Sequence, residues 1–560
     1  MEGVFSSVDT MWVLIAAALV FFMQAGFAMV ETGFTRAKNA GNIIMKNLMD
    51  FSIGTPAFWL IGFGIMFAGS GPFIGGLDFM VRGNYDSAFP TYAFLIFQTV
   101  FCATAATIVS GAMAERTKFS SYCIYSLIIS AVIYPISGHW IWGGGWLSQL
   151  GFHDFAGSTA VHMVGGIASL IGAKIVGPRI GKYSKSGESR AIPGHSLTLG
   201  ALGVFILWFC WFGFNGGSTV SMTGDDTIVS ASKIFVTTNL AAATAAVLTM
   251  IITWIRYKKP DVSMTLNGAL AGLVAITAGC DAVSPFGAFC IGIIASLVII
   301  FGIEFVDKVL KIDDPVGAVG VHGLAGAAGT ILTGVFALDG GLAYGGGFAF
   351  LGVQCLGVVS VMAWVSVTMG IVFTVIKKTI GLRVSRAEEV AGLDLTEHNI
   401  TSSYADFMVS PVGFVSEDLK HASDIEVPSN VAIPVVNNSK PGAKMTKVVV
   451  LTKQNRFELL KAAFDQIGIT GMTVTQVLGC GMQRGGREYY RGIPLESTLL
   501  PKVKVEVVIC KVPLQLCVDT IKKALYTGNI GDGKIFVYDV ENVIKVRTGE
   551  QGYDALQDNE

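Results

Sequence analysis

The segment DFAGSTAVHMVGG, residues 154–166, and the segment DPVGAVGVHGLAG, residues 314–326, repeat one pattern. In each, an Asp is followed eight residues later by a His within an apolar, glycine-rich stretch. Ionisable side chains are costly inside membrane-spanning helices, and where they occur they usually line an interior path or site. Asp154 with His162, and Asp314 with His322, are therefore the first candidates for function.

The composition around these segments is typical of a polytopic membrane protein. Of 560 residues, 52% are hydrophobic and 14% are charged, and the mean hydropathy is +0.60. A formal net charge of −1 without a long basic block argues against a nucleic-acid partner. The nine cysteines are scattered without a CxxC pair, so we interpret them as small core residues. Because no Lys or Arg precedes the first apolar run, we expect that run to be a retained span.

Eleven apolar stretches are long enough to cross a hydrocarbon layer of about 30 Å. They lie near residues 11–34, 43–69, 91–114, 119–142, 158–178, 196–216, 233–256, 264–280, 285–306, 317–337 and 347–376. Basic residues gather in every second connection, beginning with Arg36, Lys38 and Lys46. By the positive-inside rule we expect the N-terminus outside the cytoplasmic (inner) membrane and the C-terminus in the cytoplasm.

The two Asp–His units enter the membrane from opposite faces, because span five follows Asp154 and span ten follows Asp314. This predicts an inverted repeat of five spans. Eight helical residues rise about 12 Å. Both histidines should therefore reach the middle of a layer about 30 Å thick and meet there. The alternative is that each is a buried core histidine bonded to a backbone carbonyl.

The chain changes character after the last span. We predict a membrane domain over residues 1–385, a cytoplasmic region and linker over 386–444, and a second domain over 445–560. In the second domain TKVVVLTK (446–453), VKVEVVIC (503–510) and IFVYDVENVIKV (535–546) are strand-like, whereas NRFELLKAAFDQIG (455–468) and LQLCVDTIKKAL (514–525) have helical spacing. The order predicts an α+β, ferredoxin-like domain behind an all-α membrane domain.

The first 400 residues resemble the Amt/Mep/Rh ammonium transporter family. The resemblance rests on FQTVF (97–101), SGAMAERTKF (110–119), HWIWGGGW (139–146), DFAGSTAVH (154–162), WFGFNGGS (211–218), DDPVGAVGVHG (313–323) and GLD…EH (392–398). It implies eleven helices per subunit, a homotrimer in membrane lipid, and a narrow apolar pore through each subunit.

By this resemblance, individual residues take roles along the pore. The implied recruitment site is Phe101, Trp142 and Ser218 with Phe97 and Asp154 nearby; the gate is Phe101 and Phe214; the pore is lined by His162, His322 and Trp211. Aromatic faces and a hydroxyl suit ammonium. Core packing is the alternative role for Phe97.

Three acidic residues need separate interpretation. We expect Asp154 to act structurally and electrostatically near a helix N-terminus, and Asp314 to cap span ten. Glu31 departs from the family pattern, and we expect it to be solvated or paired near Arg36.

The implied mechanism is recruitment of NH4+, its deprotonation near Phe101, Trp142 and Asp154, passage of NH3 past the histidines, and reprotonation.

The last 115 or so residues closely resemble the PII signalling family. The resemblance rests on GITGMTV (468–474), GCGMQRGG (479–486), LPKVKVE (500–506), TGNIGDGKIFV (527–537) and VIKVRTGE (543–550). It implies a homotrimer that binds ATP or ADP between subunits. The implied nucleotide contacts are Thr473, Gly479, Gly481, Gln483, Glu506, Gly531, Asp532, Gly533, Lys534, Lys545 and Arg547.

Other PII positions carry further implied roles. Gln483 and Lys502 match residues that hold 2-oxoglutarate, and Gln483 also matches the ligand of Mg2+ bound with ATP. Residues 481–499 match the mobile T-loop, in which Arg491 corresponds to the residue that can plug the mouth of an ammonium channel. Two departures, Met482 and Leu495, bear on γ-phosphate binding and on uridylylation.

The leading hypothesis is an ammonium transporter regulated in cis by a PII domain that senses ATP, ADP and 2-oxoglutarate. Two threefold modules can share one axis. One alternative is an ammonium receptor whose PII domain signals to another cytoplasmic nitrogen-signalling protein, and another is a conduit for a different small neutral molecule. We do not expect an enzyme, because the sequence lacks a nucleophile–base constellation and metal-ligand spacing.

Overall fold

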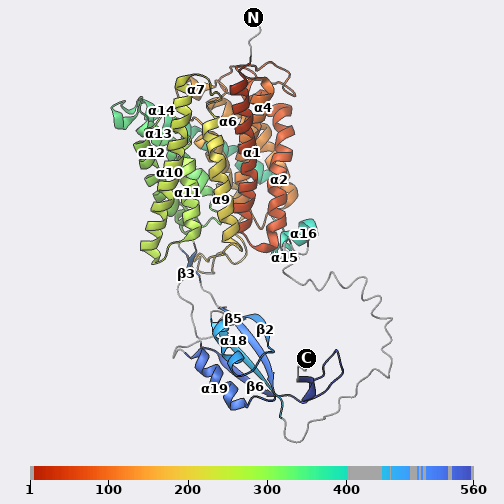
Figure 1. The fold of residues 1–560 in the computed structure, drawn as a ribbon. Helices are drawn as coiled ribbons and strands as arrows, with labels where there is room; N and C mark the ends of the chain where they lie inside the picture. Colours follow the sequence, from red (N-terminus) through yellow and green to blue (C-terminus); the bar gives the residue numbers. More distant parts are fainter. Residues whose placement is uncertain are drawn as a thin grey trace. The chain divides into compact units, whose positions relative to one another are not determined.

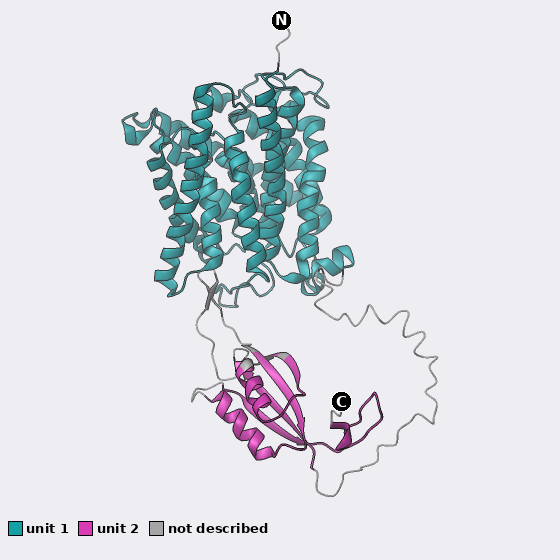
Figure 2. Ribbon diagram, viewed as in Figure 1, with its two compact units in different colours: residues 1–409, 489–494 teal, residues 410–488, 495–560 magenta. Residues whose placement is uncertain are grey.

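A computed structural model gives the fold (Figure 1) and describes residues 5–400, 403, 444–453, 456–479, 488–490, 493–495, 500–526 and 532–556. The chain divides into two compact units, drawn in two colours in Figure 2. The first contains residues 1–409 with 489–494, and the second contains residues 410–488 with 495–560.

Residues 5–400 of the first unit are mainly helical. Its helices are α1 (Ser7–Phe34), α2 (Ala40–Ala57), α3 (Phe63–Phe67), α4 (Thr91–Ala112), α5 (Phe119–Ile128), α6 (Tyr134–Ile141), α7 (Trp146–Gln149), α8 (Val164–Val176), α9 (Leu197–Trp211), α10 (Asp225–Tyr257), α11 (Val262–Ile276), α12 (Pro285–Glu304), α13 (Ala325–Phe336), α14 (Phe348–Thr379), α15 (Arg386–Ala391) and α16 (Leu393–His398). π-helical turns extend several of them: η2 (Phe58–Gly62), η3 (Ile129–Ile133), η4 (Ser158–Met163), η5 (Phe212–Gly216), η6 (Phe305–Val309) and η7 (Val319–Leu324).

The described helices agree with the expected spans, with one difference. Ten helices are long and apolar enough to cross a membrane, and the remaining expected span, near residues 264–280, is the shorter apolar helix α11 of 15 residues. A helix of this length rises only about 22 Å. It packs against α9, α10, α12 and α13, so protein surrounds it.

The two Asp–His units have matching local structure. Each histidine lies on a π-helical turn, His162 on η4 and His322 on η7, and each turn leads into a helix, α8 or α13. The units touch where Gly166 meets Gly323, since a Cβ on Gly166 would lie 2.1 Å from the backbone nitrogen of Gly323. Only glycine permits this approach, which brings the two turns together.

The short helices α15 and α16 pack on the first unit. Lys38 Nζ donates to the carbonyls of Glu389 and Val390, each at 2.7 Å. Asp394 accepts hydrogen bonds from the backbone nitrogens of Gly41 and Asn42 at 3.0 and 2.8 Å. Residues 386–398, which begin the predicted cytoplasmic region and linker over 386–444, are therefore a folded part of the first unit.

The second unit is an antiparallel sheet with two helices. Its elements are β1 (Thr446–Lys453), α18 (Phe457–Gln466), β2 (Thr473–Gly479), β5 (Leu500–Ile509), α19 (Leu514–Leu525) and β6 (Lys534–Asp539). The strands β3 (Glu488–Tyr490) and β4 (Ile493–Leu495) form a separate pair, most of which is grouped with the first unit. The strand order β2-β5-β1-β6 is that of the predicted ferredoxin-like fold. The buried faces of β1 and β5 pack on α18 and α19 through Val448, Val505 and Leu460.

The strand predicted over 535–546 is shorter in the structure. β6 ends at Asp539. Beyond it, Asn542 Oδ1 accepts hydrogen bonds from the backbone nitrogens of Val543 and Gly552 at 2.9 and 3.0 Å. This side chain satisfies backbone donors that a continued strand would have used, which turns the chain away from the sheet.

Candidate functional site

Aromatic rings from α4, η5 and the end of α6 meet at one point of the first unit. The rings of Phe101 and Phe214 stack with centroids 4.3 Å apart, and Phe97 and Trp142 lie 4.8 and 6.1 Å from Phe101. Phe101 and Phe214 are buried, whereas Trp142 is half-buried. Ser218, also half-buried, donates its hydroxyl proton to the carbonyl of Phe214 at 2.8 Å, so its oxygen retains acceptor capacity. The structure thus brings together the ring pair and its partly open aromatic neighbours.

Asp154 caps the turn that carries His162. Its carboxylate accepts hydrogen bonds from four backbone nitrogens, those of residues 157, 158, 159 and 160, at 2.8–2.9 Å. Gly157 has a φ of +114°, a conformation that favours glycine. Trp142 Nε1 donates to the Asp154 carbonyl at 2.7 Å. Asp154 therefore positions both the aromatic group and the histidine turn.

Asp314 repeats this cap at the second turn. It accepts from the nitrogens of Gly317 and Val319 at 3.0 and 2.8 Å, the same offsets of three and five residues. Gly317 also has a positive φ, +85°. The two turns thus share their cap as well as their histidines.

The histidines of the two turns face each other. His162 Nδ1 and His322 Nδ1 are 3.3 Å apart, and the ring centroids are 5.2 Å apart. One Nδ1 must carry the proton that the other accepts. His162 stacks on Trp211 at 5.0 Å and lies 5.2 Å from Phe214, so it joins the histidine pair to the ring stack.

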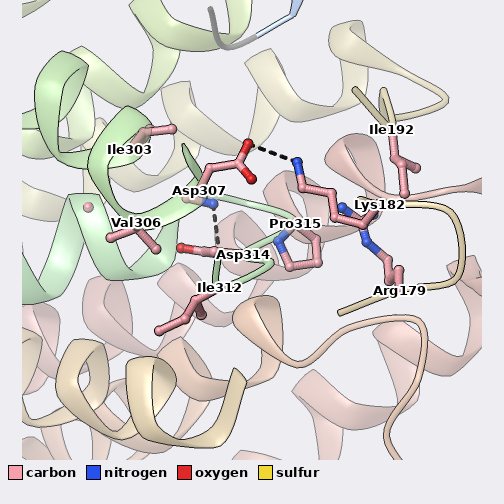
Figure 3. Close-up of a pocket in the computed structure, with 11 residues that line it drawn as sticks. Arg179, Lys182, Ile192, Ile303, Val306, Asp307, Ile312, Asp314 and Pro315 are labelled. Carbon is pink, nitrogen blue, oxygen red and sulfur yellow. Dashed lines mark hydrogen bonds and ion pairs between the residues drawn. The ribbon is translucent and has the colours of Figure 1, made fainter. Parts of the chain in front are cut away.

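A network of ion pairs lies beside Asp314. Arg179 is buried and contacts Glu115 at 2.7 Å and Asp313 at 2.9 Å. Burial alone would raise the pKa of Asp313, but the Arg179 charge outweighs it and holds that pKa well below its ordinary value. Figure 3 shows the neighbouring pair, Lys182 and Asp307, 2.8 Å apart, beside a small cavity.

Glu31 is not solvated, and Arg36 is not its partner. Glu31 is 3% exposed, and its Oε2 accepts hydrogen bonds from Ser110 and Asn47 at 2.7 and 3.3 Å. Arg36 pairs with Glu115 instead. The reason is that Glu31 lies in the last turn of α1 and faces α2 and α4, whereas Arg36 follows the helix end.

The PII positions that the structure describes lie in two groups. Thr473 of β2 pairs directly with Glu506 of β5, and Lys447 contacts Glu506 at 2.9 Å. Lys534 begins β6 at the opposite edge of the sheet, next to Asp532 and Gly533. Three strand spacings, about 14 Å, separate the two edges. A single chain therefore does not bring these groups into one pocket.

Further PII positions can be placed in part. Gly479 ends β2, Lys502 lies on β5, and Lys545 Nζ contacts Glu550 at 3.8 Å. Arg547 follows in the C-terminal segment. The remaining predicted positions, Gly481, Gln483, Arg491 and Gly531, lie outside the described residues.

Several residues around the ring stack and the histidine pair were not predicted from sequence. The Phe27 ring lies 5.9 Å from His322, and Thr277 accepts a hydrogen bond from Trp211 Nε1 at 2.9 Å. Asn267 is 1% exposed in α11, and both of its amide atoms are without partners among the described residues. A single Asn in an apolar helix was a signal that could have identified it.

Comparison with known proteins agrees with this geometry. Residues 11–403 match the family model described as Ammonium Transporter Family, and residues 445–550 match that of Nitrogen regulatory protein P-II. The chain belongs to the ammonium transporter family and carries a PII domain at its C-terminal end. It is a multi-pass membrane protein.

Individual relatives cover the membrane unit. Ammonium transporter Amt2 of Archaeoglobus fulgidus is 49% identical over 416 residues, which is 70% of this chain and 87% of the relative. Ammonium transporter 1 member 3 of Solanum lycopersicum is 39% identical over 429 residues, 71% and 93% of the two chains. Both are named as transporters.

Two solved structures show the same fold. A structure described as Sensor Amt Protein has a TM-score of 0.67 and 41% identity, and the match covers 70% of this chain and 98% of that chain. The crystal structure of Candida albicans Mep2 has a TM-score of 0.63 and 28% identity, with coverage of 69% and 88%.

Proposed function

We propose that the protein carries ammonium inward across the cytoplasmic membrane as a homotrimer with one pore per subunit. The observation that supports this most directly is the continuous row of rings from Trp142 through Phe101 and Phe214 to His162 and His322. Such a row supplies cation–π contacts at one end and hydrogen-bonding groups in a dry interior at the other. The N-terminus lies outside and residues 445–560 lie in the cytoplasm.

The ring pair determines the form in which the substrate passes. Phe101 and Phe214 stack too closely to admit a hydrated ion, so ammonium leaves its water at Phe101, Trp142 and Ser218. Asp154 supports this step by holding Trp142 and by its negative charge, which favours a cation nearby. Ammonia then passes His162 and His322, and it regains a proton beyond them.

The PII domain regulates this transport. ATP or ADP binds between subunits, which fits the separation of Thr473 on the edge strand β2 from Lys534 on the opposite edge strand β6. The turn before Lys534 is held against β1, because Gly533 has a φ of +129° and a Cβ there would lie 2.3 Å from the Leu451 carbonyl. Backbone N–H groups of such a glycine-rich turn suit phosphate oxygens. Gln483 and Lys502 hold 2-oxoglutarate, Gln483 would also hold the Mg2+ that accompanies ATP, and Arg491 of the T-loop closes the pore.

The test is the current produced by ammonium jumps on proteoliposomes of the full chain. It is recorded with ADP, with ATP, and with ATP plus 2-oxoglutarate on the cytoplasmic side. A current that changes with these ligands supports regulated, electrogenic transport. A current indifferent to all of them contradicts the regulatory role, and the absence of both current and ammonia flux contradicts transport.

A second candidate is an ammonium sensor. It is favoured by the similarity to the structure described as Sensor Amt Protein. The match covers 98% of that structure's chain. In this case ammonium binding at Trp142 and Phe101 changes the surface that the PII domain offers to a cytoplasmic partner. Saturable ammonium binding without flux, accompanied by ammonium-dependent protection of residues 445–560 from protease, would favour the sensor.

A further inference from the structure

A small cavity adjoins the histidine pair. It is lined by His322 but not by His162 or Phe214, and its other walls are Phe27, Val30, Glu31, Ile108, Leu207, Asn267, Leu270, Val316, Ala318 and Val321. About 20 Å³ is open to the centre of a water-sized molecule, which is room for about one water. Ammonia is of similar size, so the cavity holds a single small molecule next to His322.

Glu31 is the acidic residue in this wall. It lies four residues after Phe27, whose ring contacts His322, and so about one helical turn of 5.4 Å further along α1. Both of its hydrogen bonds, from Ser110 and Asn47, end on Oε2. Oε1 is therefore left for a molecule in the cavity.

Two further polar groups face the same space. Asn267 is buried, and its amide nitrogen and oxygen have no partner among the described residues. His322 uses Nδ1 toward His162, which leaves Nε2 on the other side of its ring. One small molecule in the cavity thus has a carboxyl, an amide and an imidazole around it.

The buried ammonium of Lys46 lowers the electrostatic cost of a charged Glu31 carboxylate, so Glu31 can be either charged or protonated. This lysine is 1% exposed, donates to the Ser110 carbonyl at 3.2 Å, and interacts electrostatically with Glu31 and Asp50. An unpaired carboxylate in such a place would be strongly unfavourable, whereas one near a buried ammonium is balanced. Asp50 is held separately by Tyr122 and Ser126.

We propose that Glu31 carries the proton between the histidine pair and the ammonia that leaves the pore. A proton removed from ammonium enters at His162 Nε2, the proton between the two Nδ1 atoms shifts to His322, and one leaves from His322 Nε2. The Glu31 carboxylate accepts it, directly or through the molecule in the cavity. The carboxyl then gives it to the lone pair of ammonia, which departs as ammonium and leaves the carboxylate. This step rests on the proposed transport function.

The test compares Glu31→Gln with Asp50→Asn in proteoliposomes of the full chain. Ammonium-jump current reports charge transfer, and alkalinisation of the vesicle lumen reports uncharged ammonia. Glu31→Gln should lower the current about a hundredfold, at the low end of the range for one lost proton-transfer group, while alkalinisation continues. Asp50→Asn removes a neighbouring buried acid that does not line the cavity, and it should keep the wild-type ratio of current to alkalinisation. Glu31→Asp, which retains a carboxyl, should recover part of the current.

The outcomes separate this proposal from the transport function. An unchanged current in Glu31→Gln overturns the proton role, and so does a loss of current and alkalinisation together in a variant that keeps its thermal unfolding midpoint. If Glu31→Gln does not fold, the other two variants decide. The proton role is also overturned if Glu31→Asp keeps the wild-type ratio of current to alkalinisation while Asp50→Asn lowers that ratio. A wild type that alkalinises the lumen without current overturns the Glu31 proposal alone, whereas a wild type with neither signal refutes transport.

Discussion

His162 and His322 hydrogen-bond to each other, and the rings of Trp211 and Phe27 lie beside them. Replacing both with alanine removes the imidazole nitrogens from the dry row of rings. Each hydrogen bond lost to ammonia in such a place is worth about 1.4 kcal/mol, so we expect transport to fall roughly tenfold or more. Ammonium flux through the double variant in proteoliposomes checks this. Cys102→Ala, which changes a buried residue of α4, serves as a folding control. Unchanged flux in the double variant would refute a pore through the histidine pair.

His153 makes a pH-dependent contact with Asp281, 3.0 Å away. Burial would lower the pKa of His153, but the hydrogen bond and charge of Asp281, with a smaller effect of Asp154, raise it. The folded state therefore favours the protonated ring. Its stabilisation is fully present below the ordinary histidine pKa of about 6.5 and is lost as the pH rises through the raised value.

Asp281→Asn should accordingly unfold at a lower temperature than wild type near pH 5.5, and this difference in midpoint should disappear by about pH 9. Because both side chains are partly exposed, we expect the variant to lose less than about 1 kcal/mol of unfolding free energy. Thermal unfolding in detergent at several pH values measures the difference. A difference that widens with rising pH would contradict the contact.

At the scale of single elements, Asp154 caps η4. Its carboxylate accepts hydrogen bonds from four backbone nitrogens of η4 and its N-terminal flank. Asp154→Ala leaves those donors buried, so we expect a loss of roughly 3 kcal/mol or more. The thermal unfolding midpoint of Asp154→Ala, compared with that of wild type, checks this, and an unchanged midpoint would contradict the cap.

Helices α15 and α16 provide a second prediction for elements. Because Asp394 and Glu389 bond to residues near the start of α2, truncation after residue 385 removes these contacts and truncation after residue 403 retains them. We expect the shorter chain to unfold several degrees lower than the longer one, as for a loss of about 1–2 kcal/mol. Differential scanning fluorimetry compares the two. Equal midpoints would mean that α15 and α16 add nothing to stability.

At the scale of the whole molecule, the two units have separate cores, one of membrane helices and one of sheet and helices. Removal of residues 445–560 should therefore leave a folded, transporting membrane unit that no longer responds to 2-oxoglutarate. Ammonium current with and without ATP and 2-oxoglutarate measures the response. A truncated protein that still responded would show that the ligand acts outside the PII domain.

Much of the fold was predictable because the spacing and number of apolar residues indicate which parts of the chain are buried. The expected spans each coincide with an apolar helix, and the strands over 446–453 and 503–510 lie at the centre of the sheet. The environment of Glu31 was not predictable, since a residue at a helix end can face either solvent or the next helix. The pairing of Arg36 with Glu115 likewise depends on residues 79 positions apart.

The sequence by itself determined the membrane class, the two-module order, the paired Asp–His units and the family, because apolar length, strand alternation and motif spacing are local properties of the chain. The tertiary structure alone decided that the two Nδ1 atoms lie 3.3 Å apart, that Asp154 caps four backbone nitrogens, and that Glu31 shares a cavity with His322. These are contacts between distant segments or choices of side-chain direction. They depend on how helices pack, and a linear pattern does not specify that.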